Sequence, residues 1–178
     1  FEQGVKRFGS RTAYVCMGKG ITYGELDELS RRFAAYLQGE LKLPRGARVA
    51  LMMPNVLQYP VALFGTLRAG YTVVNVNPLY TARELEHQLC DAGADVVVIL
   101  ENFAHTLEQV RGRVPVKHVV VSSLGEMLGF PKSALVNFVV RRVKKMVPAW
   151  KLDGAITFAA ALARGERHRL QAVEVGHE

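Results

Sequence analysis

The side chains best placed for chemistry follow predicted strands, where a parallel sheet usually holds its ligands. None of them is a nucleophile with a general base beside it, so they predict no complete acid–base or covalent site. The sequence also contains no GxxxxGK(S/T) or GxGxxG phosphate motif, no GxSxG elbow and no HExxH. These strand-end residues are Met53, Asn55, Asn75, Asn77 and Glu101.

The histidines offer no alternative centre. Their spacing does not match that of zinc ligands, so ordinary surface or partly buried side chains are expected and no metal site is assigned. The five are His87, His105, His118, His168 and His177.

A basic stretch at residues 132–147 is the second candidate. At helical periodicity its apolar residues fall on one arc and its cations on the other, with Pro131 and Pro148 at the expected start and stop. The apolar arc holds Leu135, Val136, Val139, Val140, Val143, Met146 and Val147. The opposite side holds Arg141, Arg142, Lys144, Lys145 and Asn137.

Three interpretations of this stretch stay open. The simplest is a surface helix packed on the sheet with a solvated basic face. The second is a helix that meets anionic lipid, with Trp150 at interfacial depth. Nucleic-acid binding is disfavoured, because no aromatic platform accompanies the charge.

Composition sets broad limits. The 23 basic and 16 acidic residues give a net charge of +7, which favours anionic partners such as nucleotides, CoA or membrane surfaces. No apolar run reaches the roughly 18–20 residues needed to cross a bilayer, and no signal-peptide pattern is visible. Cys16 and Cys90 form no CxxC motif, so two buried thiols in a cytosolic protein are expected, with a single disulfide as the alternative.

The first elements that position these residues form an N-terminal unit. Helical spacing predicts a helix near residues 1–8, followed by strands at 13–17 and 21–23 with a hairpin turn at 18–20. Thr22 then stands three residues before Glu25, which is the spacing of a capping box and predicts a helix that stops at Gly39.

Strands and helices alternate after this unit. Strands are predicted at residues 48–52, 72–76, 95–100 and 116–121. The first helix between them is predicted at 56–68, with Asn55 as its N-cap and a bend at Pro60. The second starts behind another capping box, formed by Thr81 and Glu84, and ends at Gly93. The third is predicted at 103–110.

This alternation predicts the fold class. The first three strands start about 23 or 24 residues apart and are apolar on both faces. Strand–helix units of this kind form a mostly parallel, doubly wound sheet with flanking helices, and here a small N-terminal β-hairpin is added. We therefore expect an α/β fold that forms part of a larger domain.

Several segments resemble the adenylate-forming superfamily. Residues 21–26 (ITYGEL) resemble its first core motif, residues 67–78 (LRAGYTVVNVNP) the second, and residues 48–55 (RVALMMPN) the strand and turn between them. The resemblance to bacterial long-chain fatty-acid–CoA ligases is closer and covers essentially the whole chain. The segments that carry it are residues 58–65, 74–89, 102–108 and 136–140.

The resemblance implies a reaction for the parent enzyme. Such enzymes use ATP and Mg²⁺ to convert a fatty acid to an acyl-adenylate with loss of pyrophosphate, and the CoA thiol then attacks to give acyl-CoA. AMP replaces hydroxide as the leaving group, and metal and basic groups stabilise charge on phosphate. The phosphate loop and the catalytic lysine of relatives are expected beyond Glu178. No catalytic, ATP-binding or metal residue is therefore assigned, and this chain alone is expected to be inactive with no cofactor bound.

The resemblance also suggests contacts. Arg83 and His87 lie where relatives can approach the CoA nucleotide, so they are CoA-side candidates. The implied protein is cytoplasmic, with fatty acid and CoA as substrates and no nucleic-acid partner, and a homodimer is one option for its assembly. It is expected to touch the inner membrane peripherally through Arg141, Arg142, Lys144, Lys145 and Trp150.

The expected organisation is one N-terminal subdomain, residues 1–178, of the large adenylate-forming domain. Its parts are 1–45 with the first-motif helix, the βαβ core at 46–122, the basic amphipathic helix at 131–150, and a linker at 164–178. Two alternatives stay open: another adenylate-forming ligase, acting on aryl or amino acids, and a stand-alone binding module that uses the basic helix.

Overall fold

A computed structural model of the chain describes residues 1–173. The end of the expected linker, residues 174–178 with His177, lies outside this part. Within residues 1–173, no helix combines the length and the apolar character that a bilayer span requires.

The N-terminal unit begins with helix α1 (Glu2–Phe8) and a hairpin of strands β1 (Thr12–Cys16) and β2 (Lys19–Thr22). The predicted hairpin is confirmed, but its turn is the pair Met17 and Gly18 and not residues 18–20. Both have positive φ, at 50° and 74°, as a tight two-residue turn between twisted strands requires.

Helix α2 (Tyr23–Ala35) starts at the predicted capping box. The Thr22 hydroxyl accepts from the Glu25 N–H at 3.1 Å, and the Glu25 carboxylate accepts from the Thr22 N–H at 2.7 Å. The predicted stop at Gly39 is wrong, because the helix continues as a π-helical segment through Tyr36–Glu40. A Cβ at Gly39 would lie 2.5 Å from the His168 ring, so this glycine allows close packing rather than ending the helix.

The central sheet confirms the predicted α/β fold. Its five strands are all parallel and lie in the order β4-β3-β5-β6-β7. They are β3 (Arg48–Met52), β4 (Thr72–Asn75), β5 (Val96–Leu100), β6 (His118–Ser122) and the unpredicted β7 (Ile156–Thr157).

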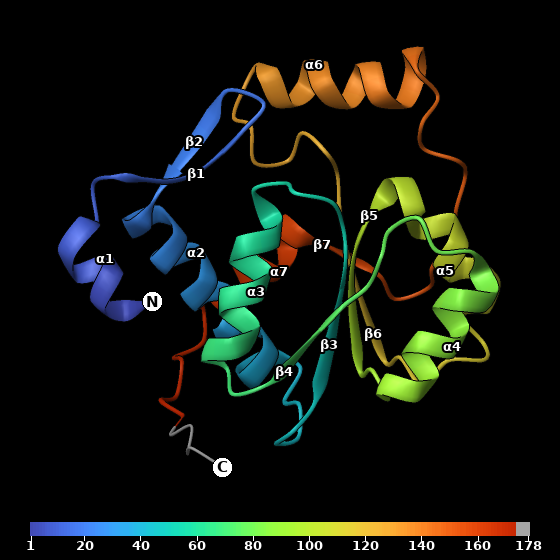
Figure 1. Cartoon of the computed structure of the whole chain (residues 1–178), viewed down its shortest axis with the longest axis horizontal. Helices are drawn as coiled ribbons and strands as arrows, with labels where there is room; N and C mark the ends of the chain where they lie inside the picture. Colours follow the sequence, from blue (N-terminus) through green and yellow to red (C-terminus); the bar gives the residue numbers. More distant parts are fainter. Residues whose placement is uncertain (174–178) are drawn as a thin grey trace.

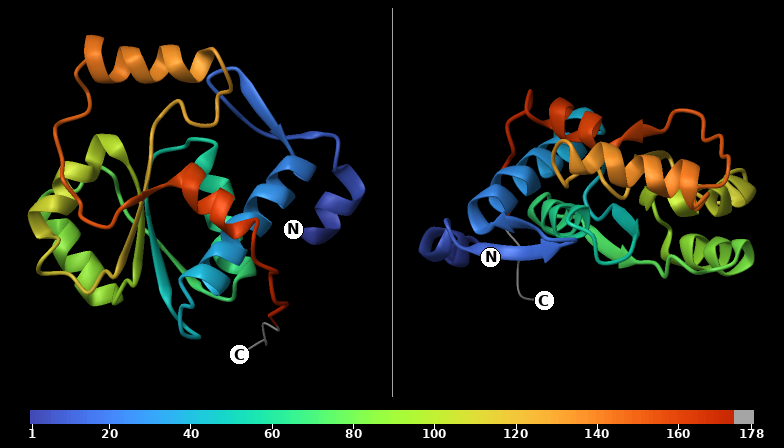
Figure 2. Two further views of the ribbon diagram at one scale, coloured as in Figure 1. Left: turned by 180° about the vertical axis from the view of Figure 1, so that it is seen from behind. Right: turned by 90° about the horizontal axis from the view of Figure 1, so that it is seen from above.

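Helices cover both faces of this sheet (Figures 1 and 2). On one face α2, α3 (Gln58–Arg68) and α7 (Phe158–Gly165) enclose a core around Phe33 and Phe158, whose rings lie 5.3 Å apart. On the other face α4 (Ala82–Ala92) and α5 (Ala104–Val110) bury Leu85 and Leu107. Every residue of β5 is buried, as expected for a central strand covered on both sides.

The start of α3 corrects two predictions. The helix begins at Gln58 with Leu57 as its N-cap residue, so Asn55 does not cap it. Pro60 is the third helical residue, where the backbone N–H it lacks would have no intrahelical partner, so the predicted bend has no basis.

Helix α4 confirms its predicted boundaries. Thr81 and Glu84 form the second capping box, and Gly93 ends the helix in the left-handed conformation, with φ of 57°. Cys16 and Cys90 are free thiols, as the main expectation had it, but the expected burial is wrong: Cys16 is half-buried and Cys90 is exposed.

Helix α6 (Lys132–Phe138) continues as a π-helical segment, Val139–Val143. The predicted basic helix at 131–150 therefore ends at Val143. It lies across the carboxyl edge of the sheet, at the top of Figure 1, and the hairpin approaches its N-terminal end.

Candidate functional site

Four of the five strand-end residues have structural roles or face solvent. Asn75 accepts a hydrogen bond from the Tyr59 hydroxyl at 2.8 Å, and the Asn77 side chain accepts from the Leu79 N–H at 3.0 Å within its own turn. Met53 is buried in the core, and Asn55 is exposed. Glu101, which is 5% exposed, is the one buried carboxylate in this set.

Glu101 directly follows β5 and is paired with Arg141. The Arg141 Nε lies 3.0 and 3.1 Å from the two carboxylate oxygens, and its Nη2 lies 2.7 Å from Oε2. These hydrogen bonds to Glu101 raise the pKa of Arg141 above its ordinary value, so the guanidinium stays charged. The pair anchors the π-helical segment to the end of β5.

A second polar cluster lies beside this pair. The Glu126 carboxylate accepts from the Ala159 N–H at 2.7 Å, from the Ser123 N–H at 3.2 Å and from the Ser122 hydroxyl. Gln58, buried in α3, donates to the Ser122 hydroxyl at 3.1 Å. Glu126 thus stabilises the first turn of α7, and the cluster joins α3, β6 and α7.

A cavity of about 410 Å³ lies between these clusters and α6. Trp150 lines it together with Glu101, Arg141 and Glu126. Both carboxylates already accept hydrogen bonds from the protein, and no nucleophile stands next to a free base among the lining residues. The carboxyl edge is therefore organised for packing and orientation rather than for acid–base chemistry.

The underside of α6 is polar. Asn137 accepts from the Gly125 N–H at 2.8 Å and donates to the Ser123 hydroxyl at 3.0 Å. Beyond the helix, the Asn102 side chain donates to the Met146 carbonyl at 3.0 Å. These bonds and the Arg141 pair attach α6 to the sheet.

The apolar arc packs on the protein only in part: Val140 is buried, and Val136 and Val139 are half-buried. Val140 is the one residue buried within Lys132–Val143. Among the remaining apolar residues of this segment and the turn after it, the exposed ones are Leu135, Phe138, Val143 and Met146. The helix therefore faces the protein through Val140 and the polar side chains of Asn137 and Arg141, and it leaves much of its apolar arc exposed.

The five membrane-contact candidates separate into two groups. Arg142, Lys144 and Lys145 are exposed, and none of them forms an ion pair within residues 1–173. Arg141 is instead engaged with Glu101, and Trp150 is half-buried against the cavity.

The CoA-side candidates occupy one face of α4. Arg83 and His87 are exposed and one helical turn apart, and the described part of the chain supplies no ion-pair partner for either. The structure thus leaves both side chains available to solvent.

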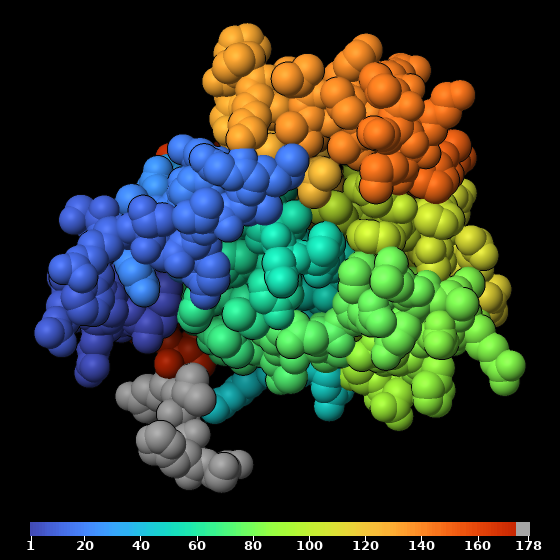
Figure 3. Space-filling view, turned by 45° about the horizontal axis from the view of Figure 1, so that its top comes forward, coloured from blue at the N-terminus to red at the C-terminus, as the bar shows by residue number. Residues whose placement is uncertain are grey.

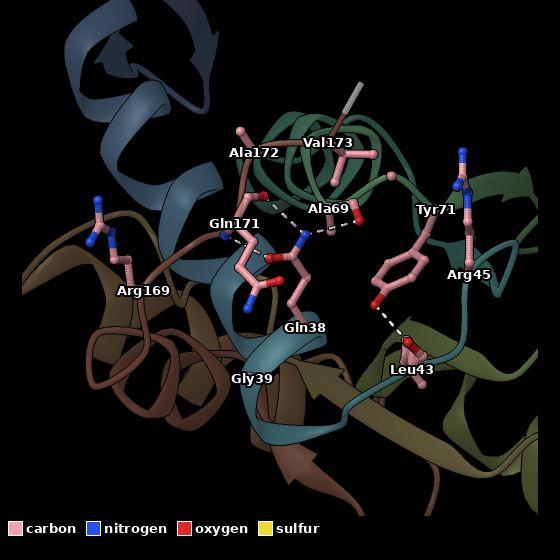
Figure 4. A pocket seen from close by; sticks show the side chains of 11 residues that line it. Gln38, Gly39, Leu43, Arg45, Ala69, Tyr71, Arg169, Gln171, Ala172 and Val173 are labelled. Carbon is pink, nitrogen blue, oxygen red and sulfur yellow. Dashed lines mark hydrogen bonds between the residues drawn. The ribbon is translucent and has the colours of Figure 1, made fainter. Parts of the chain in front are cut away.

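Sequence reasoning missed a side-chain clamp at Gln38 (Figure 4). Its amide nitrogen donates to the Ala69 and Gln171 carbonyls at 3.2 and 3.3 Å, and its oxygen accepts from the Gln171 N–H at 2.9 Å. The chain after α7 is thereby held beside α2 and lines an open pocket of about 960 Å³, with Arg45 and Arg169 at its sides. Nothing local in the sequence signals the clamp, because its partners are 133 residues apart.

Comparison with known proteins identifies the family of the chain. The model of the AMP-binding enzyme family matches residues 1–155. The chain belongs to the AMP-binding enzyme family. It is 58% identical, over 167 residues and 94% of its length, to a long-chain-fatty-acid–CoA ligase of Escherichia coli O157:H7. It is 54% identical, over its whole length, to a long-chain-fatty-acid–CoA ligase of Haemophilus influenzae.

The chain spans 30% and 32% of the length of these two relatives. A solved structure of a putative long-chain-fatty-acid CoA ligase from Rhodopseudomonas palustris superimposes on 98% of the chain with a TM-score of 0.74. At 18% identity, and with 37% of that protein covered, this likeness supports the fold.

A metal ion finds no ready cluster of ligands among the described residues of this family member. Within residues 1–173, no group of three or more His, Cys, Asp or Glu side chains is placed to hold a metal ion. The carboxylates at the sheet edge, Glu101 and Glu126, are engaged within the protein.

Proposed function

We propose that the chain is the N-terminal part of a ligase that activates long-chain fatty acids and transfers them to CoA. The observation that carries the proposal is the identity of 58% over 94% of the chain to a ligase named for this reaction. In the longer protein, ATP and Mg²⁺ are proposed to form an acyl-adenylate, which the CoA thiol converts to acyl-CoA.

Within such a ligase this chain supplies a scaffold. The parallel sheet presents the ends of β5 and β6 at one edge, and the Glu101–Arg141 pair fixes α6 above that edge. Arg83 and His87 are proposed to approach the CoA phosphates, because both are exposed cationic or ionisable groups on one face of α4.

The proposed location is the cytoplasm, with peripheral contact at the inner membrane, where long-chain fatty acids partition. The exposed cations that support this contact are Arg142, Lys144 and Lys145. Arg141 is less available, because its guanidinium is held by Glu101.

The experiment uses the full-length protein that contains this chain. Given ATP, Mg²⁺ and a C16 fatty acid, it should release pyrophosphate, and adding CoA should yield the acyl-CoA thioester. Benzoate and amino acids are tested in parallel as substrates of the alternative adenylate-forming reactions. Turnover of an aryl or amino acid in place of the fatty acid would replace the proposal with another adenylate-forming reaction. Residues 1–178 alone should release no pyrophosphate, and release by them would contradict the expected division of the enzyme.

A further inference from the structure

Three segments far apart in the sequence bring exposed apolar side chains to one side of the molecule. The hairpin contributes Val15 and Met17, and the loop before α6 contributes Phe130, which is 90% exposed. The α6 segment and the turn after it complete the surface, which we call the apolar crest: Val15, Met17, Phe130, Leu135, Phe138, Val143 and Met146.

The hairpin and α6 are in direct contact. The Lys132 ammonium, in the first turn of α6, donates to the Met17 carbonyl at the hairpin turn. A Cβ at Gly18 would lie 3.4 Å from the same ammonium, so the two segments approach closely. Figure 3, with the top of the molecule turned forward, shows the hairpin and α6 beside each other on one face.

Within Lys132–Val143 only Val140 is buried, so α6 does not pack on the core through most of its apolar stripe. Asn137 and Arg141 face the sheet and make its hydrogen bonds. Leu135 and Phe138 remain 63% and 59% exposed on the outer side. A soluble surface helix buries its apolar stripe, so this arrangement calls for an apolar or interfacial environment outside the protein.

Charge identifies that environment. Residues 127–152 contain no Asp or Glu but include six cations: Lys132, Arg141, Arg142, Lys144, Lys145 and Lys151. Of these, Arg142 lies on the outer side of α6 beside Phe138, and its long stem allows the guanidinium to reach phosphates while neighbouring residues insert. Apolar side chains bordered by cations fit the boundary between anionic headgroups and acyl chains.

We propose that the apolar crest inserts into the surface of an anionic lipid bilayer, with the hairpin turn and α6 entering together. The proposal makes the membrane contact suggested above more specific. It rests on the proposed function only for the reason why a membrane contact would be useful, which is access to a lipid substrate. It differs in mechanism, because apolar insertion at two linked segments replaces attraction by a basic face alone.

Insertion would also orient the protein. Glu101 follows β5, and Ser122 is the last residue of β6. Both lie beneath α6 and line the cavity there. A docked crest therefore turns the carboxyl edge of the sheet toward the bilayer, the source of a lipid substrate.

The test measures cosedimentation of the full-length protein with vesicles of phosphatidylcholine containing phosphatidylglycerol. One variant is Leu135→Ser with Phe138→Ser, and a second is Val15→Ser with Met17→Ser. The matched control is Leu79→Ser, because Leu79 is 80% exposed but lies between β4 and α4. Each crest variant should bind vesicles about tenfold more weakly, while the control binds as the unchanged protein does.

Salt separates insertion from simple attraction. In 0.5 M NaCl the unchanged protein should retain measurable binding, because screening weakens the ionic contribution and leaves apolar insertion. Complete loss of binding in salt, together with normal binding by both crest variants, would overturn the proposal in favour of a basic-face contact.

Two other outcomes would also overturn it. Crest variants that bind vesicles normally but lose a lipid-independent dimer in sedimentation velocity would identify a second copy as the occupant. Crest variants with normal vesicle binding and lower stability in urea would show that another part of the ligase covers the crest. Pyrophosphate release is followed separately with detergent-dispersed fatty acid, so failure of the ligase proposal is distinguishable from failure of docking.

Discussion

Arg141 and Glu101 form a forked ion pair across 40 residues of sequence, with N···O distances of 2.7–3.1 Å. The arginine belongs to the π-helical segment Val139–Val143, and the glutamate directly follows the buried strand β5. A π-helical segment changes the direction of the side chains that follow it, which here accompanies an arginine facing inward. The basic side of the predicted helix is therefore partly an anchor.

Replacing Arg141 should destabilise the protein more than replacing Glu101. Arg141→Gln leaves the buried Glu101 carboxylate without its cation, whereas Glu101→Gln leaves a half-exposed guanidinium that water can solvate. We expect Arg141→Gln to lower the free energy of unfolding by about 1–3 kcal/mol and Glu101→Gln by less. Urea unfolding measures both.

The double variant provides the internal check on the pair. Because the two side chains act together, their combined effect should be smaller than the sum of the single effects by at least about 0.5 kcal/mol. Arg142→Gln is the matched control, since Arg142 is exposed and forms no ion pair within residues 1–173. Additive single effects would show that the contact contributes no coupling energy.

The capping box at α2 should give stability a defined pH dependence. The hydrogen bond from the Thr22 backbone N–H holds the pKa of Glu25 below its ordinary value of 4.5. With a lowered folded-state pKa, this contribution is complete above about pH 4.5 and is lost as the pH falls through the folded-state value. Glu25→Gln should therefore reduce the loss of stability between pH 7 and pH 3. An unchanged pH profile in urea titrations would argue against the linkage.

The Thr22 hydroxyl makes the other half of the same box. Thr22→Ala removes the acceptor for the Glu25 N–H and should cost about 1 kcal/mol of unfolding free energy. Thr81→Ala in the second box should cost no more than this, because the corresponding bond from the Glu84 N–H is longer, at 3.4 Å. A substitution that costs nothing at either position would mean that solvent replaces the hydroxyl fully.

The CoA-side proposal predicts a selective kinetic change. In the full-length ligase, Arg83→Ala should raise the KM for CoA and leave fatty-acid-dependent pyrophosphate release unchanged, because adenylation precedes CoA binding. Arg45→Ala is the control, since Arg45 is exposed and precedes β3, whereas Arg83 lies in the helix that follows the carboxyl end of β4. If CoA kinetics were the same in all three proteins, Arg83 would have no role at that site.

Much of the fold followed from local rules. The parallel sheet was predictable because apolar strands alternate with helices, and both capping boxes formed at Thr22 and Thr81 as their spacing required. Short elements were missed: β7 has two residues, Ile156–Thr157, and pairs with β6 only after the α6 excursion. A strand of that length has no periodicity to detect.

The site was harder to predict, because its geometry depends on contacts between distant segments. Periodicity grouped Arg141 with the other cations, but its partner Glu101 is set by the position of β5. The Gln38 clamp has the same origin, since Gln171 reaches it only when α7 packs on α2. Sequence patterns fixed which side chains share a face, and tertiary packing decided which face is buried.

Gly165 marks the place where that packing is closest. A Cβ there would lie 1.9 Å from the Arg32 carbonyl oxygen, so α7 can approach α2 only through a glycine. Because the obstacle is backbone, Gly165→Ala must push α7 outward, and we expect a loss of about 2 kcal/mol or more in urea unfolding.

Gly112 offers the matched control for this substitution. No atom lies within 4 Å of a Cβ built there, and its φ is not positive, so Gly112→Ala should change stability by no more than about 0.5 kcal/mol. Gly39→Ala should fall between the two, because its obstacle is the His168 side chain, which can rotate away at the expense of its 3.1 Å contact with Glu40. Equal effects at all three glycines would mean that backbone flexibility, rather than helix contact, determines the cost.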